Sequence, residues 1–348
     1  MRSEDIAKLA GVSRSTVSRV LNNYPDIPQR TREKVLRIIE QYHYEPNTSA
    51  RALAGKGTDT IGLFVVSMAE RLAGNRIYQN HYFAPIVDTV IDTANAAGYY
   101  VLVHTVYTQD DYLKIKQAYQ QRRIDGGIIV GTQKDTDRIA EIANLGKPFV
   151  LIDYDISELT DQSLDQHPMS IINSDDFEGA CEAMRHLIRL GHRRIGHIRG
   201  RMNTYSGRQR FLAYETVMNE YGLPYDDRDI VDGDFLKEAA YEQIVRMLKL
   251  DHMPTALFSA NDDMALAAIQ AFHDNGIRVP DDISIIGFDD IPIASQYIPS
   301  LSTVRLPIYD MSKEAVNQIV GMCSSSASSP LSSTFPTELI IRDSCKRL

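Results

Sequence analysis

The chain has 348 residues, a net charge of −9 and three cysteines that are far apart in sequence and lack metal-ligand spacing. This length exceeds one ordinary core, and the cysteine pattern argues against a disulfide framework or a zinc site. The longest apolar runs are far shorter than a membrane span and no N-terminal targeting segment is visible, so we expect a soluble cytoplasmic protein.

A helix-turn-helix pattern fills the start of the chain. The apolar spacing over residues 5–10 predicts a first helix with Leu9 in its buried face, and Gly11 follows as a stop that tolerates a left-handed backbone. Ser13 suits the N-cap of a second helix. The outward side chains of this second helix are candidate readers of base edges: Arg14, Ser15, Ser18 and Arg19.

Charge separates this head from the rest of the chain. Residues 1–57 carry ten Lys and Arg against six Asp and Glu, a balance of +4, whereas the remaining residues carry −13. A basic head on an acidic body favours binding to phosphate. On the residues alone, an ordinary helix corner with solvated arginines remains the alternative. The segment at about 47–56 is too short for a stable isolated helix and is expected to order on DNA.

Two series of strand-like runs and helical stretches predict two parallel-sheet α/β lobes in residues 58–348. Residues 324–333 are serine-rich and predict an exposed loop. The strand-like runs of the first lobe are 61–66, 100–103, 126–130 and 149–152, and those of the second are 170–172, 195–198, 256–258 and 283–287.

Polar and aromatic side chains near the strand ends predict a ligand site in the cleft between the lobes. Carboxylate, amide and guanidinium groups can bind vicinal hydroxyls, and aromatic rings can cover the apolar face of a sugar. For Asp262 and Asp290, capping of a helix or support of a lobe crossing is the alternative, and for Phe83 a place in the core. The candidates are Asp153, Arg208, Arg210, Asn261, Asp262, Asp289 and Asp290, with the rings of Tyr82, Phe83, Tyr205 and Phe235.

Catalytic motifs are missing from the sequence. It contains no phosphate-binding loop, nucleophile elbow or HExxH motif, and the nine histidines are scattered. The pair Asp289-Asp290 does not suit acid-base chemistry, since sequence neighbours rarely face one substrate. We therefore expect a protein without enzymatic activity, cofactor or metal.

The sequence closely resembles the LacI/GalR family of bacterial transcriptional regulators. The head motif DIAKLAGVSRSTVSRVLN at 5–22 is followed by TREKV at 31–35 and YEPN at 44–47. In the body, GHRRI at 191–195, SANDDMA at 259–265 and VPDDISIIGFDD at 279–290 are similar to the family's effector-domain signatures. The resemblance covers nearly the whole chain. One departure is Arg2, where family members usually have a threonine that caps the first helix.

The resemblance implies a helix-turn-helix head, at 1–57, and an effector-binding and dimerisation body of the periplasmic-binding-protein type I fold, at 58–348. It implies a hinge helix at about 47–56 and lobe crossings near 162–170, 290–293 and 320–324. The stretch 68–80 is longer than the usual family loop and is expected at the cleft mouth. It either narrows the site, contributes Arg76 and Tyr78 to the binding of a larger sugar, or is a plain surface insertion.

By the same resemblance, the chain is a homodimeric repressor of a carbohydrate-utilisation operon. Its partners would be double-stranded operator DNA and a sugar or sugar phosphate, with no membrane contact. The alternatives are a nucleoside-type effector, disfavoured by Thr204 where the purine-responsive branch has arginine, and a sugar receptor without a DNA role. The implied DNA contacts are Arg14, Ser15, Thr16, Ser18, Arg19, Asn47, Ala50, Arg51 and Leu53. The implied effector contacts are Tyr82, Phe83, Asp153, Arg210, Phe235, Asn261 and Asp289.

Overall fold

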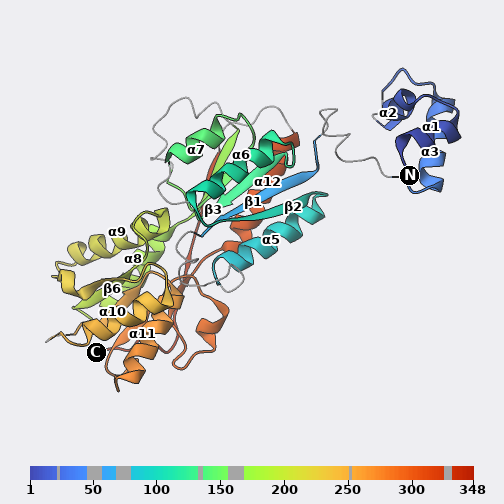
Figure 1. The fold of residues 1–348 in the computed structure, drawn as a ribbon. Helices are drawn as coiled ribbons and strands as arrows, with labels where there is room; N and C mark the ends of the chain where they lie inside the picture. The colour runs from blue at the N-terminus through green and yellow to red at the C-terminus, as the bar shows by residue number, and fades with distance from the viewer. Residues whose placement is uncertain are drawn as a thin grey trace. The chain divides into compact units, whose positions relative to one another are not determined.

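The chain forms two compact units, Met1–Thr58 and Asp59–Leu348 (Figure 1). Among the described residues, no helix is both long and apolar enough to cross a lipid bilayer. The predicted hinge helix, with Asn47, Ala50, Arg51 and Leu53, lies outside the described residues, as does the stretch 68–79. The computed structural model describes residues 1–21, 24–44, 57–67, 80–131, 136–155, 168–250, 253–324 and 331–348.

The first unit is a helical head whose turn follows the predicted pattern. Gly11 ends the first helix with a φ of 61°, in the left-handed region that glycine tolerates. The Ser13 hydroxyl accepts a hydrogen bond from the backbone N–H of Thr16 at 3.1 Å, which confirms the predicted N-cap of the second helix. The described helices of the head are α1 (Ser3–Ala10), α2 (Arg14–Leu21) and α3 (Gln29–Gln41).

The core of the head is small and fully apolar. Ile6, Val17 and Val35 have no exposed side-chain surface and hold the three helices together. The prediction that Leu9 faces this core is wrong, because Leu9 is 46 % exposed. The small side chain of Ala7 takes the inward position instead, since α1 packs closely against both α2 and α3.

The start of α1 shows how the unusual Arg2 is accommodated. Its side chain makes no capping hydrogen bond. The Asp5 carboxylate instead accepts a hydrogen bond from the backbone N–H of Arg2 at 2.8 Å, so one half of a capping box is present.

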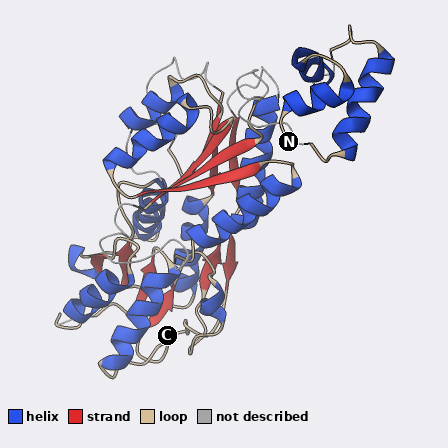
Figure 2. Ribbon diagram, turned by 45° about the vertical axis from the view of Figure 1, so that its right-hand side comes forward, coloured by secondary structure: helices blue, strands red, loops and turns tan. Residues whose placement is uncertain are grey.

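The first lobe of the body is a six-stranded parallel sheet with helices on both faces (Figure 2). Alternate residues of its strands enter two separate cores, one with α5 (Phe83–Ala96) and α12 (Ile308–Ser324), the other with α6 (Tyr112–Gln120) and α7 (Thr136–Ala143). In spatial order the strands are β11 (Leu331–Phe335), β5 (Met169–Ser174), β4 (Phe149–Ile152), β3 (Gly126–Val130), β1 (Thr60–Val66) and β2 (Tyr100–Val106).

The second lobe repeats this architecture with four parallel strands. Its two helix pairs are α8 (Asp176–Arg189) with α9 (Tyr205–Glu220), and α10 (Lys237–Met247) with α11 (Asp262–Asp274). In spatial order the strands are β7 (Ile230–Asp232), β6 (Ile195–Arg199), β8 (Ala256–Ser259) and β9 (Ser284–Ile286), and β10 (Thr303–Arg305) pairs antiparallel with β12 (Glu338–Ile340). The predicted two-lobe α/β fold class is confirmed.

The three lobe crossings differ from the predicted positions. The run at 170–172, assigned to the second lobe, is part of β5 and pairs with β4 in the first lobe, so the first crossing is at 174–176. The second crossing is at 305–308, after β10, and the third is at 335–338, after β11. The predicted loop at 324–333 is wrong for its last residues, because 331–333 belong to β11 and their backbone groups pair with those of β5.

Candidate functional site

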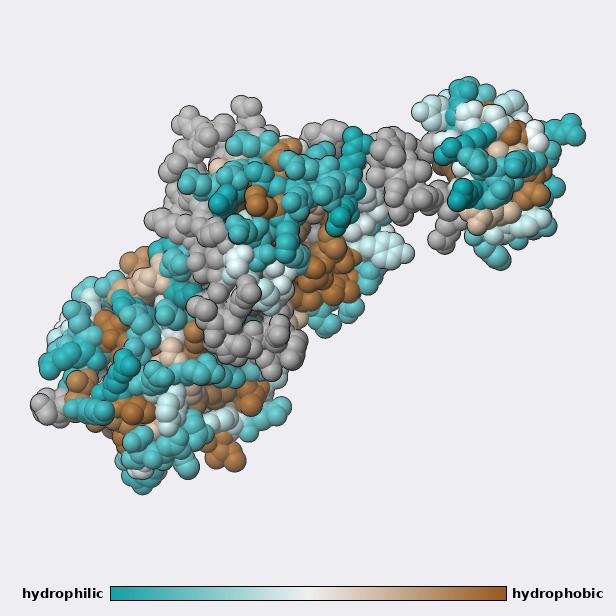
Figure 3. Space-filling view, in the orientation of Figure 1, coloured by the Kyte–Doolittle hydropathy of each residue, from teal (hydrophilic) through white to brown (hydrophobic). Residues whose placement is uncertain are grey.

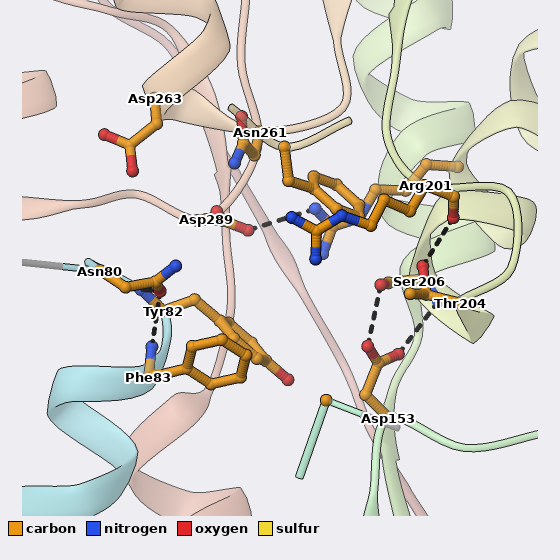
Figure 4. Close-up of a pocket in the computed structure, with 13 residues that line it drawn as sticks. Asn80, Tyr82, Phe83, Asp153, Arg201, Thr204, Ser206, Asn261, Asp263 and Asp289 are labelled. Atoms are coloured by element: carbon orange, nitrogen blue, oxygen red, sulfur yellow. Dashed lines mark hydrogen bonds and ion pairs between the residues drawn. The ribbon is translucent and has the colours of Figure 1, made fainter. Parts of the chain in front are cut away.

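A pocket of about 580 Å³ of space free of protein atoms lies between the two lobes. Figure 4 shows side chains from both lobes converging on it. All seven effector candidates inferred from the family resemblance line the pocket: Tyr82, Phe83, Asp153, Arg210, Phe235, Asn261 and Asp289. Thr204, the position that argued against a purine effector, and Asn80, the end of the stretch expected at the cleft mouth, also line the pocket. Four further lining residues were not predicted from the sequence: Gly131, Arg201, Ser206 and Asp263.

Arg210 forms the polar floor of the pocket. Its Nε donates a hydrogen bond to Asp176 at 2.7 Å, and its Nη1 donates to Asp289 at 3.2 Å and to the carbonyl of Ala260. The guanidinium also lies 3.8 Å from the centre of the Phe288 ring. These contacts fix the guanidinium plane, so Arg210 presents a preorganised donor edge rather than a mobile side chain.

Asp289 shares this floor and has an unusual environment. Its φ of 117° lies in the region that disfavours non-glycine residues, which marks a tightly constrained loop. Burial raises the pKa of its carboxyl to about 7, although the Arg210 guanidinium opposes the rise. Because Arg210 and Asp289 contact each other, they form one adjacent pair of groups that can bind neighbouring hydroxyls together.

The neighbouring carboxylates have structural partners. Asp262 accepts hydrogen bonds from the Thr303 hydroxyl at 2.6 Å and from the Ile291 backbone at 2.9 Å, so it supports the loop that carries Asp289. Asp290 is paired with Arg305 and Arg342. Neither residue lines the pocket. Asp290 supports the second lobe crossing through Arg305, whereas Asn261 and not Asp262 caps α11.

Asp153 joins the lobes across one side of the pocket. It directly follows β4 of the first lobe, whereas Ser206 lies at the start of α9 in the second lobe. The Asp153 carboxylate accepts hydrogen bonds from both the backbone N–H and the hydroxyl of Ser206. Burial raises the pKa of the Asp153 carboxyl to about 6, and the nearby Asp176 adds to the rise. A second interlobe pair, Arg208 with Asp155 at 3.3 Å, lies beside it, so Arg208 holds the lobes together and does not line the pocket.

Asp263 makes a third interlobe connection. It forms a hydrogen bond of 2.9 Å with His81 of the first lobe and an ion pair of the same length with Lys237 of the second lobe. These hydrogen bonds and charges hold the pKa of Asp263 below its usual value, against the opposing effect of burial. The carboxylate is therefore a bridge between the lobes as well as part of the pocket wall.

Two of the lining residues also cap helices. Asn261 accepts a hydrogen bond from the backbone N–H of Met264 at 2.9 Å and so caps α11. Thr204 caps α9 in the same way through Gly207, at 3.1 Å. A capping residue at the carboxyl end of a parallel strand is held at the cleft edge, which is the signal that could have identified Thr204 from the sequence.

The aromatic lining residues come from both lobes. Tyr82 and Phe83 lie before and at the start of α5 with their rings 5.3 Å apart, edge to face, and Phe83 also enters the core of the first lobe. Phe235 has a φ of 61°. Its ring packs so closely on Gly200 that a side chain at position 200 would collide with it. Tyr205 does not line the pocket.

The candidate DNA-reading residues lie on the exposed side of α2. Arg14, Ser15, Ser18 and Arg19 are exposed, and Thr16 is half-buried. Arg14 has a single long contact to Glu4 at 3.4 Å. Most of the α2 surface is therefore available to a partner.

Two family models match separate parts of the chain. The model for bacterial regulatory proteins of the lacI family matches residues 4–47, which include the helix-turn-helix. The model for a periplasmic binding protein-like domain matches residues 184–345.

Curated relatives and solved structures extend this similarity to the whole chain. The relative named "Probable HTH-type transcriptional repressor ExuR" from Bacillus subtilis (strain 168) is 35% identical over 99% of this chain and 98% of its own length. The HTH-type transcriptional repressor PurR of Haemophilus influenzae (strain PittEE) is 34% identical over 90% of this chain and 88% of its own length. A Lac repressor dimer bound to operator and the anti-inducer ONPF is 28% identical with a TM-score of 0.80, and a complex of the regulator CelR with cellobiose is 27% identical with a TM-score of 0.73. Each of these two structures covers 99% of both chains.

Proposed function

The chain belongs to the lacI family of bacterial regulatory proteins, and from that premise we propose that a carbohydrate bound between its lobes controls its affinity for operator DNA. As a member of this family it is a DNA-binding transcriptional repressor and not an enzyme. The head argues against a sugar receptor without a DNA role, because a DNA-binding family model matches it.

The composition of the pocket lining carries the carbohydrate proposal. Asp289 and Arg210 bring an acceptor and a donor fork to the floor of the pocket, and Asn261 lines it with an amide. Asp153 and Ser206 supply a second polar wall. Sugars present adjacent hydroxyls that are both donors and acceptors, and they have apolar ring faces. Tyr82, Phe83 and Phe235 offer rings for those faces.

Control of DNA binding requires that the ligand prefer one arrangement of the lobes. The pocket meets this requirement because its walls come from both lobes, and Asp153 and Asp263 bridge them. A ligand that binds between such walls changes the relative stability of the closed and open arrangements. In the proposed dimer that change alters the spacing of the two heads on DNA.

On DNA, we place α2 in the major groove, with Arg14, Ser15 and Arg19 at base edges and Thr16 and Ser18 beside them. The segment at 47–56 follows as a minor-groove element in which Leu53 enters a base step, with Asn47, Ala50 and Arg51 around it. Leu53→Ala should then reduce operator bending while ligand affinity stays the same.

Two measurements test the proposal. Calorimetry against a panel of monosaccharides, disaccharides, sugar phosphates, nucleosides and purine bases should find a carbohydrate that binds the wild-type protein. The same compound should shift the operator affinity in a gel-shift titration, with salt-dependent binding of the protein to DNA. Binding of a purine and of no carbohydrate would overturn the effector class, and it would favour a PurR-like response.

A further inference from the structure

Arg19, near the end of α2, is held by two residues of the loop that leads to α3. Its Nη2 forms an ion pair and hydrogen bond with the Asp26 carboxylate. On the other side, its guanidinium lies 5.5 Å from the centre of the Tyr24 ring. Arg14, at the opposite end of α2, differs from Arg19 because it has only the 3.4 Å contact to Glu4.

The loop that carries these partners is itself anchored to the head. The backbone N–H of Tyr24 donates to the carbonyl of Arg19 at 3.0 Å, which ties the loop to the end of α2. The Tyr24 carbonyl in turn accepts a hydrogen bond from the guanidinium of Arg32 on α3. Tyr24 is therefore anchored at its N–H and at its carbonyl, and Asp26 follows two residues later in the same loop, so both can orient Arg19.

Orientation matters because an arginine reads a guanine through two parallel N–H donors in one plane. A free arginine side chain loses most of its rotamer freedom when it makes that contact. Holding the guanidinium between a carboxylate and a ring removes much of this freedom before DNA binds. The contact to Asp26 uses one donor of Nη2, and the side chain is still about half exposed, so further donors of the fork remain for a base edge.

The negative charge of Asp26 also supports a role in pairing with Arg19. Asp26 is an exposed acidic residue beside the surface that faces a polyanion, and an unneutralised carboxylate there would repel phosphates. Paired with Arg19, it contributes no net charge to the interface. We infer that Asp26 is a specificity-determining residue for operator recognition, which acts by positioning Arg19. This inference rests on the proposed placement of Arg19 at a base edge.

The test compares base-preference profiles. Full-length wild-type protein first selects sites from a randomised double-stranded DNA library, and single-base variants of the selected site are then titrated against each variant protein. Arg19→Ala identifies the positions that depend on Arg19. Asp26→Asn should relax preference at those same positions by about tenfold, the scale of one lost base contact, and Asp26→Glu should retain it.

Glu40→Gln is the matched control, since it removes the same charge from an exposed position on α3. It should change affinity for all sequences equally and leave the profile intact. In the Arg19→Ala background, Asp26→Asn should have no further effect on the profile. Thermal unfolding of each variant verifies that the head remains folded.

An unchanged base-preference profile in Asp26→Asn would overturn the inference. So would a loss of preference caused by Asp26→Asn that is equally large with and without Arg19→Ala. A gain in affinity at the selected site with an unchanged profile would show that Asp26 competes with DNA for Arg19. If the wild-type protein selected no site at all, the proposed function itself would fail, which separates the two outcomes.

Discussion

The Asp153 carboxylate accepts two hydrogen bonds from Ser206, one at 3.0 Å from the backbone N–H and one at 2.9 Å from the hydroxyl. The two residues belong to different lobes, so these bonds hold the pocket walls at a defined separation. A ligand hydroxyl that inserts between them must replace both bonds, which makes this contact sensitive to the shape of the effector.

Replacing Asp289 with alanine should weaken binding of the effective carbohydrate by about tenfold or more. The reason is that Arg210 would lose one of its two carboxylate partners inside a buried site, and the ligand would lose an acceptor. Calorimetry measures the change, with Asp310→Asn on the exposed side of α12 as control. Operator affinity without ligand should remain normal. Equal affinities in mutant and wild type would show that Asp289 only supports its loop.

The carboxyls of Asp153 and Asp289 should stabilise the body at about pH 4, and this contribution should be lost as the pH rises to about 7. The folded-state pKa values of Asp153, about 6, and Asp289, about 7, lie above the ordinary value of 3.8. At these two carboxyls the folded protein therefore holds more protons than the unfolded chain in this window, and raising the pH removes that stabilisation. Urea unfolding measures the free energy of unfolding at each pH. Between about pH 4 and about pH 6, the Asp153→Asn variant should lack the downward contribution of Asp153 to its slope. A slope that is the same in the mutant would contradict the assignment to Asp153.

Asp263→Asn should shift the body toward the open lobe arrangement. The change removes the charge that Lys237 and His81 share, and it weakens the interlobe bridge. Effector affinity should fall by about two- to fivefold, the equivalent of up to about 1 kcal/mol for a partly exposed pair. Distance measurements between spin labels on the two lobes should show a larger open population. No change in either quantity would mean that the bridge forms without influencing closure.

Substitutions of Arg14 or Ser15 should change base preference at particular operator positions by about 1–3 kcal/mol. Both residues are exposed in the first turn of α2, where side chains of this motif meet base edges. Gel-shift titration against single-base operator variants gives the profile. A uniform loss of affinity on every variant would assign these residues to phosphate contacts.

Leu102→Asp should weaken self-association of the protein. β2 is an edge strand whose Tyr100, Leu102 and Val103 are 72%, 37% and 40% exposed, and Figure 3 shows an apolar patch over this region. Such a patch fits a second copy of the chain in a symmetric dimer. Sedimentation analysis should show a lower dimer fraction in the mutant, while Leu113→Asp on α6, another exposed leucine, should leave it unchanged.

The sequence predicted those features that depend on local pattern. The N-cap at Ser13, the stop at Gly11 and the strands with continuous apolar runs all follow from short stretches of chain. The pocket residues Arg210 and Asp289 followed from the family resemblance and from their positions after strand ends. Their contact with each other did not, because it depends on Asp176 and on the left-handed backbone at 289.

Long-range relationships were the ones missed. Residues 331–335 have no strong strand pattern, and they become a strand because β5 offers an open edge. Asp263 was not selected, since its bridge needs a histidine 182 residues away in sequence. Leu9 was misassigned because helical periodicity does not reveal which neighbouring helix approaches most closely.

The order of segments in the body has a consequence for synthesis on the ribosome. The sheet of the first lobe receives β11 and the helix α12 only from residues 308–335, after all of the second lobe that precedes its last strand, β12, has been translated. The three described helices of the head, by contrast, are all translated by residue 41. A nascent or prematurely terminated chain therefore carries a complete DNA-reading head on a body whose first lobe lacks an edge strand and a covering helix. In the proposed function, only a fully translated chain can couple DNA binding to the ligand pocket.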